Sequence, residues 1–117
     1  MMKLYREAQL LMSDLEIANT FYKRLRGMIR RPISALYIPR CNSIHTYFMH
    51  KPIDVLFLNK NGEILFISRN VGSRRLRMWR SATHVLELDA HMAEQLGLSE
   101  GQHLRIEKSP LYSNSPK

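Results

Sequence analysis

Short runs in which apolar and polar residues alternate recur along most of the chain. In one of them Leu15 and Ile17 are separated by Glu16, so the two apolar side chains fall on one face of an extended strand. Asn61-Gly62 stands between two such runs and is a strong signal for a β-hairpin. The pattern predicts strands over residues 3–6, 10–18, 34–38, 43–49, 53–58, 63–67, 84–88 and 103–106.

One segment has helical rather than alternating spacing. Phe21, Leu25 and Met28 recur at i, i+4 and i+7, which places their side chains on one face of a short helix. The helix follows Asn19 and Thr20, either of which is suited to cap its first turn. We therefore predict a short helix between the second and the third strand.

A second short helix is predicted near the end of the chain. Asp89 is a candidate N-cap, Met92 and Leu96 share a face, and Gly97 ends the helix. Many short strands with few helices are typical of small β-rich domains. The predicted fold class is α+β and β-rich, as a small, partly closed antiparallel barrel or sandwich with two short helices.

Length and composition indicate one small domain. The 117 residues are enough for a single modest core, predicted over residues 1–107, and the serines and prolines of 108–117 predict a flexible C-terminal tail. The longest unbroken apolar runs, such as residues 55–58, are too short to cross a bilayer. Residues 1–11 do not have the pattern of a signal peptide, and the single cysteine excludes an internal disulfide. The predicted location is therefore the cytoplasm.

The chain is strongly basic, with 18 Lys and Arg against 10 Asp and Glu and a net charge of +8. Basic residues gather in segments 23–31 and 69–80, and residues 70–81 are predicted to be an exposed loop. An arginine-rich loop that contains a tryptophan can contact phosphates and stack on bases, although a solvated surface has the same composition. The candidate nucleic-acid contacts are Arg74, Arg75, Arg77, Trp79 and Arg80.

A second group of polar residues lies in and before the central predicted strands. Cys41, His45 and Thr46 precede a strand in which Asp54 shares a face with leucines. A carboxylate there needs hydrogen-bond partners, so Asp54 is either a structural acceptor or part of a site. We predict a ligand or partner site at Cys41, His45, Thr46 and Asp54.

The same residues do not predict a complete catalytic or metal centre. In an extended strand Cys41 and His45 lie about 13 Å apart, at roughly 3.3 Å per residue, which is too far for a nucleophile and its base. A thiol enzyme that uses Cys41 and His45 is therefore an alternative and not the leading prediction. The cysteine and the five histidines have no familiar zinc spacing. No catalytic residue, metal or cofactor is predicted.

Four blocks of the chain resemble one known family. They read LEIANTFYKR, RLRGMIRR, CNSIHTYFMHKPIDVLFLNKNGEIL and SATHVLELDAHMAEQLGLSEGQHLRI. The resemblance covers about residues 9–107, in the same order and spacing as in the family. The chain is similar to the Domain of Unknown Function 192 family, in the variant that has Cys-Asn-Ser-Ile-His-Thr at residues 41–46. Met28-Ile29 departs conservatively from the usual Leu-Met. The resemblance implies a compact β-rich bacterial or archaeal domain without assigned biochemistry, and a link to secretion or pilus systems.

Three functions follow as hypotheses. The first is a non-enzymatic binding or accessory domain, whose protein or small-molecule partner contacts the polar cluster around Asp54. The second is nucleic-acid binding through the arginine-rich segment. The third is the thiol enzyme. We favour the first, because the sequence contains no complete catalytic constellation.

Overall fold

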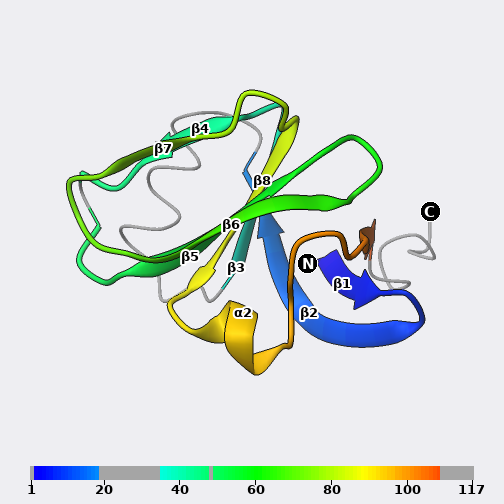
Figure 1. The fold of residues 1–117 in the computed structure, drawn as a ribbon. Coiled ribbons are helices and arrows are strands. Elements are labelled where there is room, and N and C mark those ends of the chain that lie inside the picture. The colour runs from blue at the N-terminus through cyan, green and yellow to red at the C-terminus, as the bar shows by residue number, and fades with distance from the viewer. Residues whose placement is uncertain (1, 19–34, 48, 109–117) are drawn as a thin grey trace, which may run out of the picture.

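A computed structural model describes residues 2–18, 35–47 and 49–108, and Figure 1 shows how they are arranged. Among these residues no helix is both long and apolar enough to cross a membrane. In chain order the elements are β1 (Met2–Arg6), β2 (Gln9–Ile17), β3 (Ala35–Pro39), β4 (Ser43–His45), β5 (Ile53–Leu58), β6 (Ile64–Val71), β7 (Leu76–Met78), β8 (His84–Asp89), the short helix α2 (Met92–Gln95) and β9 (Leu104–Lys108).

Seven strands form one mixed sheet in the order β6-β5-β8-β3-β2-β1-β9. The pair β2–β3 is parallel, whereas the other neighbours are antiparallel. The β-rich class is confirmed, but a purely antiparallel sheet is wrong. The chain between β2 and β3 is long enough for the crossover that parallel neighbours need, a possibility that the sequence reading did not use.

The predicted barrel is not closed by the described residues. The edges of the seven-stranded sheet, β6 and β9, meet only at an isolated bridge between Glu63 and His103. Hydrogen bonds on either side of the bridge join Ile64 N to Gln102 O at 2.8 Å and Leu104 N to Gly62 O at 2.8 Å. The contact between the two edges is therefore short and depends on the turn at Gly62.

The predicted hairpin is confirmed. β5 and β6 pair antiparallel, and the Asn59 side chain organises their connection, because its Oδ1 accepts the N–H groups of Asn61 and Glu63 at 2.9 and 3.0 Å. Gly62 completes the turn with a φ of 83°, which is the left-handed region that favours glycine. The turn chemistry read from the sequence is therefore the chemistry that connects these two strands.

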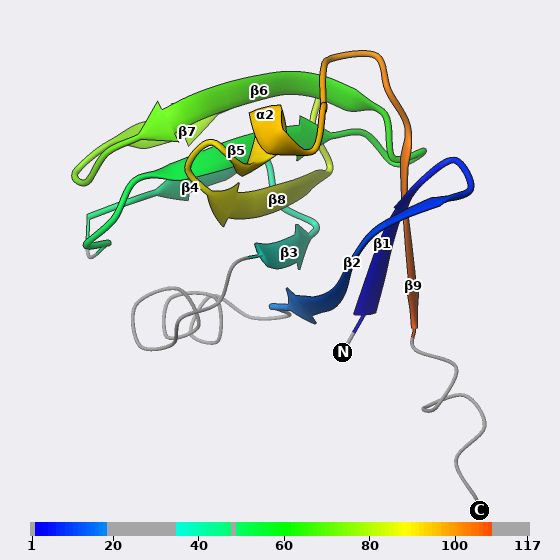
Figure 2. The ribbon, with the colours of Figure 1, turned by 90° about the horizontal axis from the view of Figure 1, so that it is seen from below.

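The middle of the sheet is buried on both faces. All six residues of β5 are buried, and successive side chains of a strand point to opposite faces, so Leu56 joins one core cluster and Phe57 joins the other. Ala93 of α2 packs in the first cluster and Ile44 of β4 in the second. The helix and the β4 segment therefore cover opposite faces of the sheet (Figure 2).

Two sequence predictions about helices have different outcomes. The first helix, with Phe21, Leu25 and Met28 on one face, lies outside the described residues, as does the predicted tail beyond residue 108. The second helix exists as α2, but Asp89 does not cap it: the N-cap position is His91, which has a φ of 75° and no side-chain capping bond. The single domain over residues 1–107 stays a prediction.

The strand prediction was wrong around β4 and β7. The expected strand over residues 43–49 ends at His45, because the chain turns where Met49 N bonds to Thr46 O at 3.1 Å. The expected arginine-rich loop contains β7, which pairs antiparallel with β4 as a separate two-stranded sheet. Figures 1 and 2 show this pair at the end of the molecule opposite to β1 and β9.

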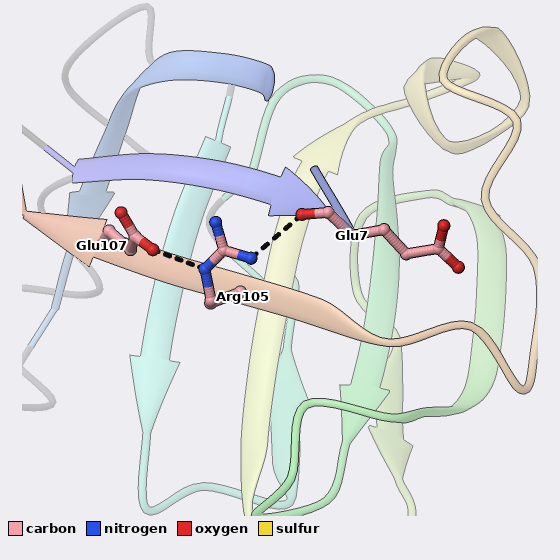
Figure 3. A network of polar contacts seen from close by, with 3 residues as sticks. All are labelled: Glu7, Arg105 and Glu107. Carbon is pink, nitrogen blue, oxygen red and sulfur yellow. Dashed lines mark hydrogen bonds and ion pairs between the residues drawn. The ribbon is translucent and has the colours of Figure 1, made fainter. Parts of the chain in front are cut away.

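At that opposite end, the last strand is fastened to the first hairpin. Arg105 of β9 donates through Nη1 to the Glu7 carbonyl at 3.0 Å and through Nε to the Glu107 carboxylate (Figure 3). The Arg105 guanidinium also lies 4.5 Å from the centroid of the Tyr5 ring, a cation–π geometry. These contacts hold β9 against β1 in an exposed, mixed-charge region.

Candidate functional site

Asp54 of β5 is a structural acceptor in this fold. Its carboxylate is almost fully buried and accepts two backbone N–H groups, Asn70 N at 2.9 Å and Ala93 N at 3.0 Å. Asn70 lies in β6 where the β5–β6 register shifts, and Ala93 lies in the first turn of α2. Asp54 therefore joins an irregular point of the sheet to a helix start, and both of its oxygens are occupied.

The Thr46 hydroxyl is also fully used in hydrogen bonds to the backbone. Its side chain is fully buried, and Oγ1 donates to Gly72 O at 2.6 Å and accepts Arg75 N at 2.9 Å. With Asp54 bound to Asn70, the two predicted site residues hold the start and the end of segment 70–75. They support the segment that leads into β7 and do not present free polar groups to a ligand.

His45 is placed elsewhere, so the predicted cluster divides. It lies on β4 opposite Leu76, and its ring centroid is 5.6 Å from that of Tyr47. Asp54 belongs to the sheet face that α2 covers, whereas β4 packs on the other face. The structure thus does not bring His45 and Asp54 into one polar site.

Cys41 lines an open pocket of about 550 Å³. The thiol donates to Ser43 O at 3.0 Å, and Cys41 N bonds to Thr83 O at 3.0 Å. The pocket brings Cys41 together with His84, and not with the His45 that the thiol-enzyme alternative requires. The residues that line it are Arg40, Cys41, Asn42, Ser43, Ala82, Thr83 and His84.

The sequence pattern does not single out His84 as a neighbour of Cys41. The pairing of β3 with β8 places His84 opposite Pro39, near the segment that contains Cys41. That signal is a sheet register and cannot be read from local spacing. Within the described part of the chain, no group of three or more His, Cys, Asp or Glu side chains is arranged to hold a metal ion.

The environment of His84 favours its neutral form. Its Nδ1 lies 2.7 Å from Thr83 Oγ1, and its ring stacks on Tyr37 with centroids 5.5 Å apart. Burial lowers the pKa of His84 below its usual value of 6.5, and a hydrogen bond with the Asn59 backbone opposes this effect. Burial raises the pKa of the neighbouring Tyr37, so both rings are uncharged near pH 7.

This lowered pKa has an expected consequence for stability. Between the folded pKa of His84 and 6.5, the unfolded chain binds more protons, so the free energy of unfolding rises with pH across that window and loses this dependence above it. Urea unfolding of the native protein and of His84→Gln, at a series of pH values from 7 to 5, measures the effect. We expect the variant to lose less stability on acidification. Equal slopes of unfolding free energy against pH in the two proteins would contradict a lowered pKa of His84.

The five residues predicted to contact nucleic acid behave differently from one another. Arg77 points inward and donates through Nε to Ser68 Oγ at 3.0 Å. Trp79 stacks on Phe66, with centroids 4.6 Å apart and ring planes at 5°. The other three, Arg74, Arg75 and Arg80, are exposed. The segment therefore presents three arginines, while its tryptophan has one ring face against the protein.

Large exposed apolar side chains gather on the β4–β7 pair. Of the five in the described residues, only Leu10 lies elsewhere, and Trp79 borders the pair. Leu76, Met78 and Tyr47 are 62%, 59% and 56% exposed. The register places His45 opposite Leu76 and Ser43 opposite Met78, so their side chains share one face. We call this surface the β4–β7 face; its residues are Ser43, His45, Tyr47, Leu76 and Met78.

The charge around the β4–β7 face has one sign. Segments 17–53 and 64–86 contain no Asp or Glu, and they supply both strands of the pair. The side chains of Arg74, Arg75 and Arg80 make no hydrogen bond or ion pair within the described structure. The face is therefore apolar, flanked by uncompensated positive charge, and at the end of the molecule opposite to β9 (Figure 2).

Comparison with known proteins gives a family and a fold. A family model, DUF192 (Uncharacterized ACR), matches residues 3–106. A UPF0127 protein of Thermococcus sibiricus is 31% identical over 104 residues, which cover 77% of this chain and 64% of the relative. The chain therefore spans less than two thirds of that relative's length.

Two further matches agree with the first. A UPF0127 protein of Pyrococcus furiosus is 32% identical over 98 residues, covering 78% of this chain and 84% of the relative. A crystal structure from Sinorhizobium meliloti 1021, named "putative transcription regulator", superposes with a TM-score of 0.73 at 23% identity, over 89% of this chain and 90% of the other. At that identity the likeness concerns the fold alone.

Proposed function

Because the chain belongs to the DUF192 family, whose description assigns no biochemical activity, we propose a function from its own surface: it is a non-enzymatic binding or accessory domain. Its partner is a protein, which it contacts through the β4–β7 face. The single observation that carries this proposal is the gathering of exposed Leu76, Met78 and Tyr47 on the β4–β7 face. Apolar side chains grouped in this way on a surface mark interaction sites, whereas scattered ones need no explanation.

A protein partner is favoured over nucleic acid by the state of the aromatic side chains. Single-stranded nucleic acid binds where successive bases can stack on exposed rings. Trp79 has one ring face against Phe66, and Arg77 is bonded to Ser68. The face has one well-exposed ring, Tyr47, and no succession of rings, while its other exposed apolar side chains, Leu76 and Met78, offer apolar contact and no base recognition. Methionine, tyrosine and arginine are enriched in protein–protein interfaces, so this combination favours a protein partner.

Two other hypotheses from the sequence have no support in the described residues. The thiol-enzyme hypothesis pairs Cys41 with His45, but the His45 ring, on β4, lies beside Tyr47, while the thiol bonds to Ser43 O. For the link to secretion or pilus systems, nothing on the described surface identifies such machinery. The proposal depends on neither.

Site-specific photo-crosslinking, in cells of the organism that naturally makes the protein, tests the proposal. A benzophenone amino acid in place of Tyr47 is expected to form one discrete, nuclease-resistant protein adduct on irradiation. The same probe at Leu10, which is 48% exposed on β2, is the matched control and is expected to form none. Adding Leu76→Glu and Met78→Glu to the Tyr47 probe is expected to reduce the adduct at least tenfold.

Both glutamates replace exposed side chains, so we expect each to change the free energy of unfolding by less than about 1 kcal/mol. A thermal melt of the double variant checks that a lost adduct reflects the surface and not unfolding. An adduct that nuclease removes would assign the face to nucleic acid. Equal adducts from positions 47 and 10, or none from either, would overturn the proposal.

A further inference from the structure

Among the residues that the structure describes, no strand covers one backbone edge of β7. In an antiparallel pair, residues alternate between those that bond across to the partner and those whose N–H and C=O point away from it. Thr46 N bonds to Arg75 O at 2.9 Å and Trp79 N to Asn42 O at 3.0 Å, which fixes this alternation. Leu76 and Met78 therefore direct their backbone groups away from β4.

Those outward groups are almost free in the described structure. The only strand paired with β7 among the described residues is β4. Leu76 O accepts the Arg77 Nη1–H at 2.9 Å, and no acceptor within the described part of the chain meets the N–H of Leu76 or Met78. Because these two residues are also among the most exposed apolar ones, both the edge and its side chains face solvent.

Proteins usually protect such an edge with lysine, proline or a bulge, since an open edge pairs with other chains. β7 has the sequence Leu-Arg-Met, and its arginine points inward to Ser68. β7 is short, at three residues, and its arginine occupies Leu76 O. The strand has no proline, however, and leaves the N–H groups of Leu76 and Met78 open to pairing. An unprotected edge with apolar side chains is the arrangement that proteins use to bind an extended peptide by strand addition.

We infer that the outer edge of β7 binds an extended acidic segment of a partner protein, which adds to the β4–β7 pair as a third strand. Segments 17–53 and 64–86 contain no carboxylate, and Arg74, Arg75 and Arg80 flank the edge, so an acidic strand matches their charge. A second copy of the chain does not, because it would bring the same positive charge to the contact. This inference rests on the proposed function and specifies its partner.

The probe is a peptide that alternates glutamate and valine, Glu-Val-Glu-Val-Glu-Val-Glu with blocked ends. We expect it to bind the full-length chain at low salt, to shift the amide resonances of Leu76 and Met78, and to protect both amides from exchange. A peptide with lysine in place of glutamate is expected to bind at least tenfold more weakly. No binding of the acidic peptide at millimolar concentration would overturn the inference.

Proline substitution distinguishes binding through the backbone edge of β7 from binding through the side chains of the β4–β7 face. Met78→Pro removes an outward N–H and leaves the bonds to β4 in place, because edge positions of this kind tolerate proline. Met78→Ala removes the same side chain and keeps the N–H. We expect Met78→Pro to bind the peptide at least tenfold more weakly than Met78→Ala. Equal affinities would overturn strand addition, while the crosslink at Tyr47 would still decide the proposed function.

If Met78→Pro disturbs the pairing with β4, N-methylated peptides give the answer without changing the protein. A strand presents alternate N–H groups on its two edges, so methylation of either the valines or the internal glutamates blocks one edge. We expect one methylated peptide to bind like the parent and the other not to bind. Equal binding of both methylated peptides would contradict strand pairing. If single-stranded RNA bound more tightly and displaced the acidic peptide, the occupant of the edge would be nucleic acid.

Discussion

Replacing Gly62 by alanine is expected to lower the free energy of unfolding by about 2–4 kcal/mol. Gly62 has a φ of 83°, where an L side chain costs about 1–2 kcal/mol. A Cβ at this position would also overlap the Leu104 carbonyl oxygen, well inside the van der Waals contact distance of the two atoms. That atom belongs to backbone and cannot rotate aside. The added methyl group would therefore separate the β5–β6 turn from β9, where Leu104 N bonds to Gly62 O.

Gly101→Ala is the matched control. Gly101 has a similar φ of 93°, but a Cβ there would meet nothing within 4 Å. It should lose only the backbone contribution of about 1–2 kcal/mol. Urea unfolding of both variants measures the difference, which reports the close approach between the hairpin and β9. Equal losses would mean that the edge contact rearranges at no cost, contrary to the geometry.

The hairpin was predictable because its signals are local. Asn59 to Gly62 determine the turn within four residues, and the alternation in β5 extends over a full strand. β7 was missed because only Leu76 and Met78 alternate there, among arginines that suggest a loop. The parallel pair β2–β3 depends on the path of the chain between them, and no local pattern determines that path.

The candidate site was harder to predict because its contacts are distant in sequence. Thr46 bonds to Gly72 and Arg75, and Cys41 shares a pocket with His84. The composition of residues 41–46 singles out this region as a candidate, and that stays a prediction. The roles of its polar side chains follow only from which strands become neighbours. Thr46 and Asp54, which were predicted to bind a ligand, instead hold the segment that leads into β7. That segment carries Arg74 and Arg75, two of the predicted nucleic-acid contacts.

Asp54→Asn is expected to lower the free energy of unfolding by about 1–3 kcal/mol. The carboxylate accepts Asn70 N and Ala93 N with separate oxygens, whereas an asparagine can accept only one of these and turns its NH₂ group toward the other. One buried donor is then left without a partner. Asp54→Ala removes both acceptors and creates a cavity as well, so its loss should be larger.

Asp14→Asn is the matched control for this change. Asp14 lies in β2 and is exposed, so the same substitution should change stability by less than about 0.5 kcal/mol. Denaturant unfolding of the three variants orders them. Removing a charge that serves ligand binding often stabilises a protein, because binding sites are commonly strained. A higher melting temperature for Asp54→Asn would therefore indicate that Asp54 is a site residue. The expected loss of stability instead indicates that Asp54 joins α2 to the register shift of β6 at Asn70. This connection keeps β7 in place for a partner.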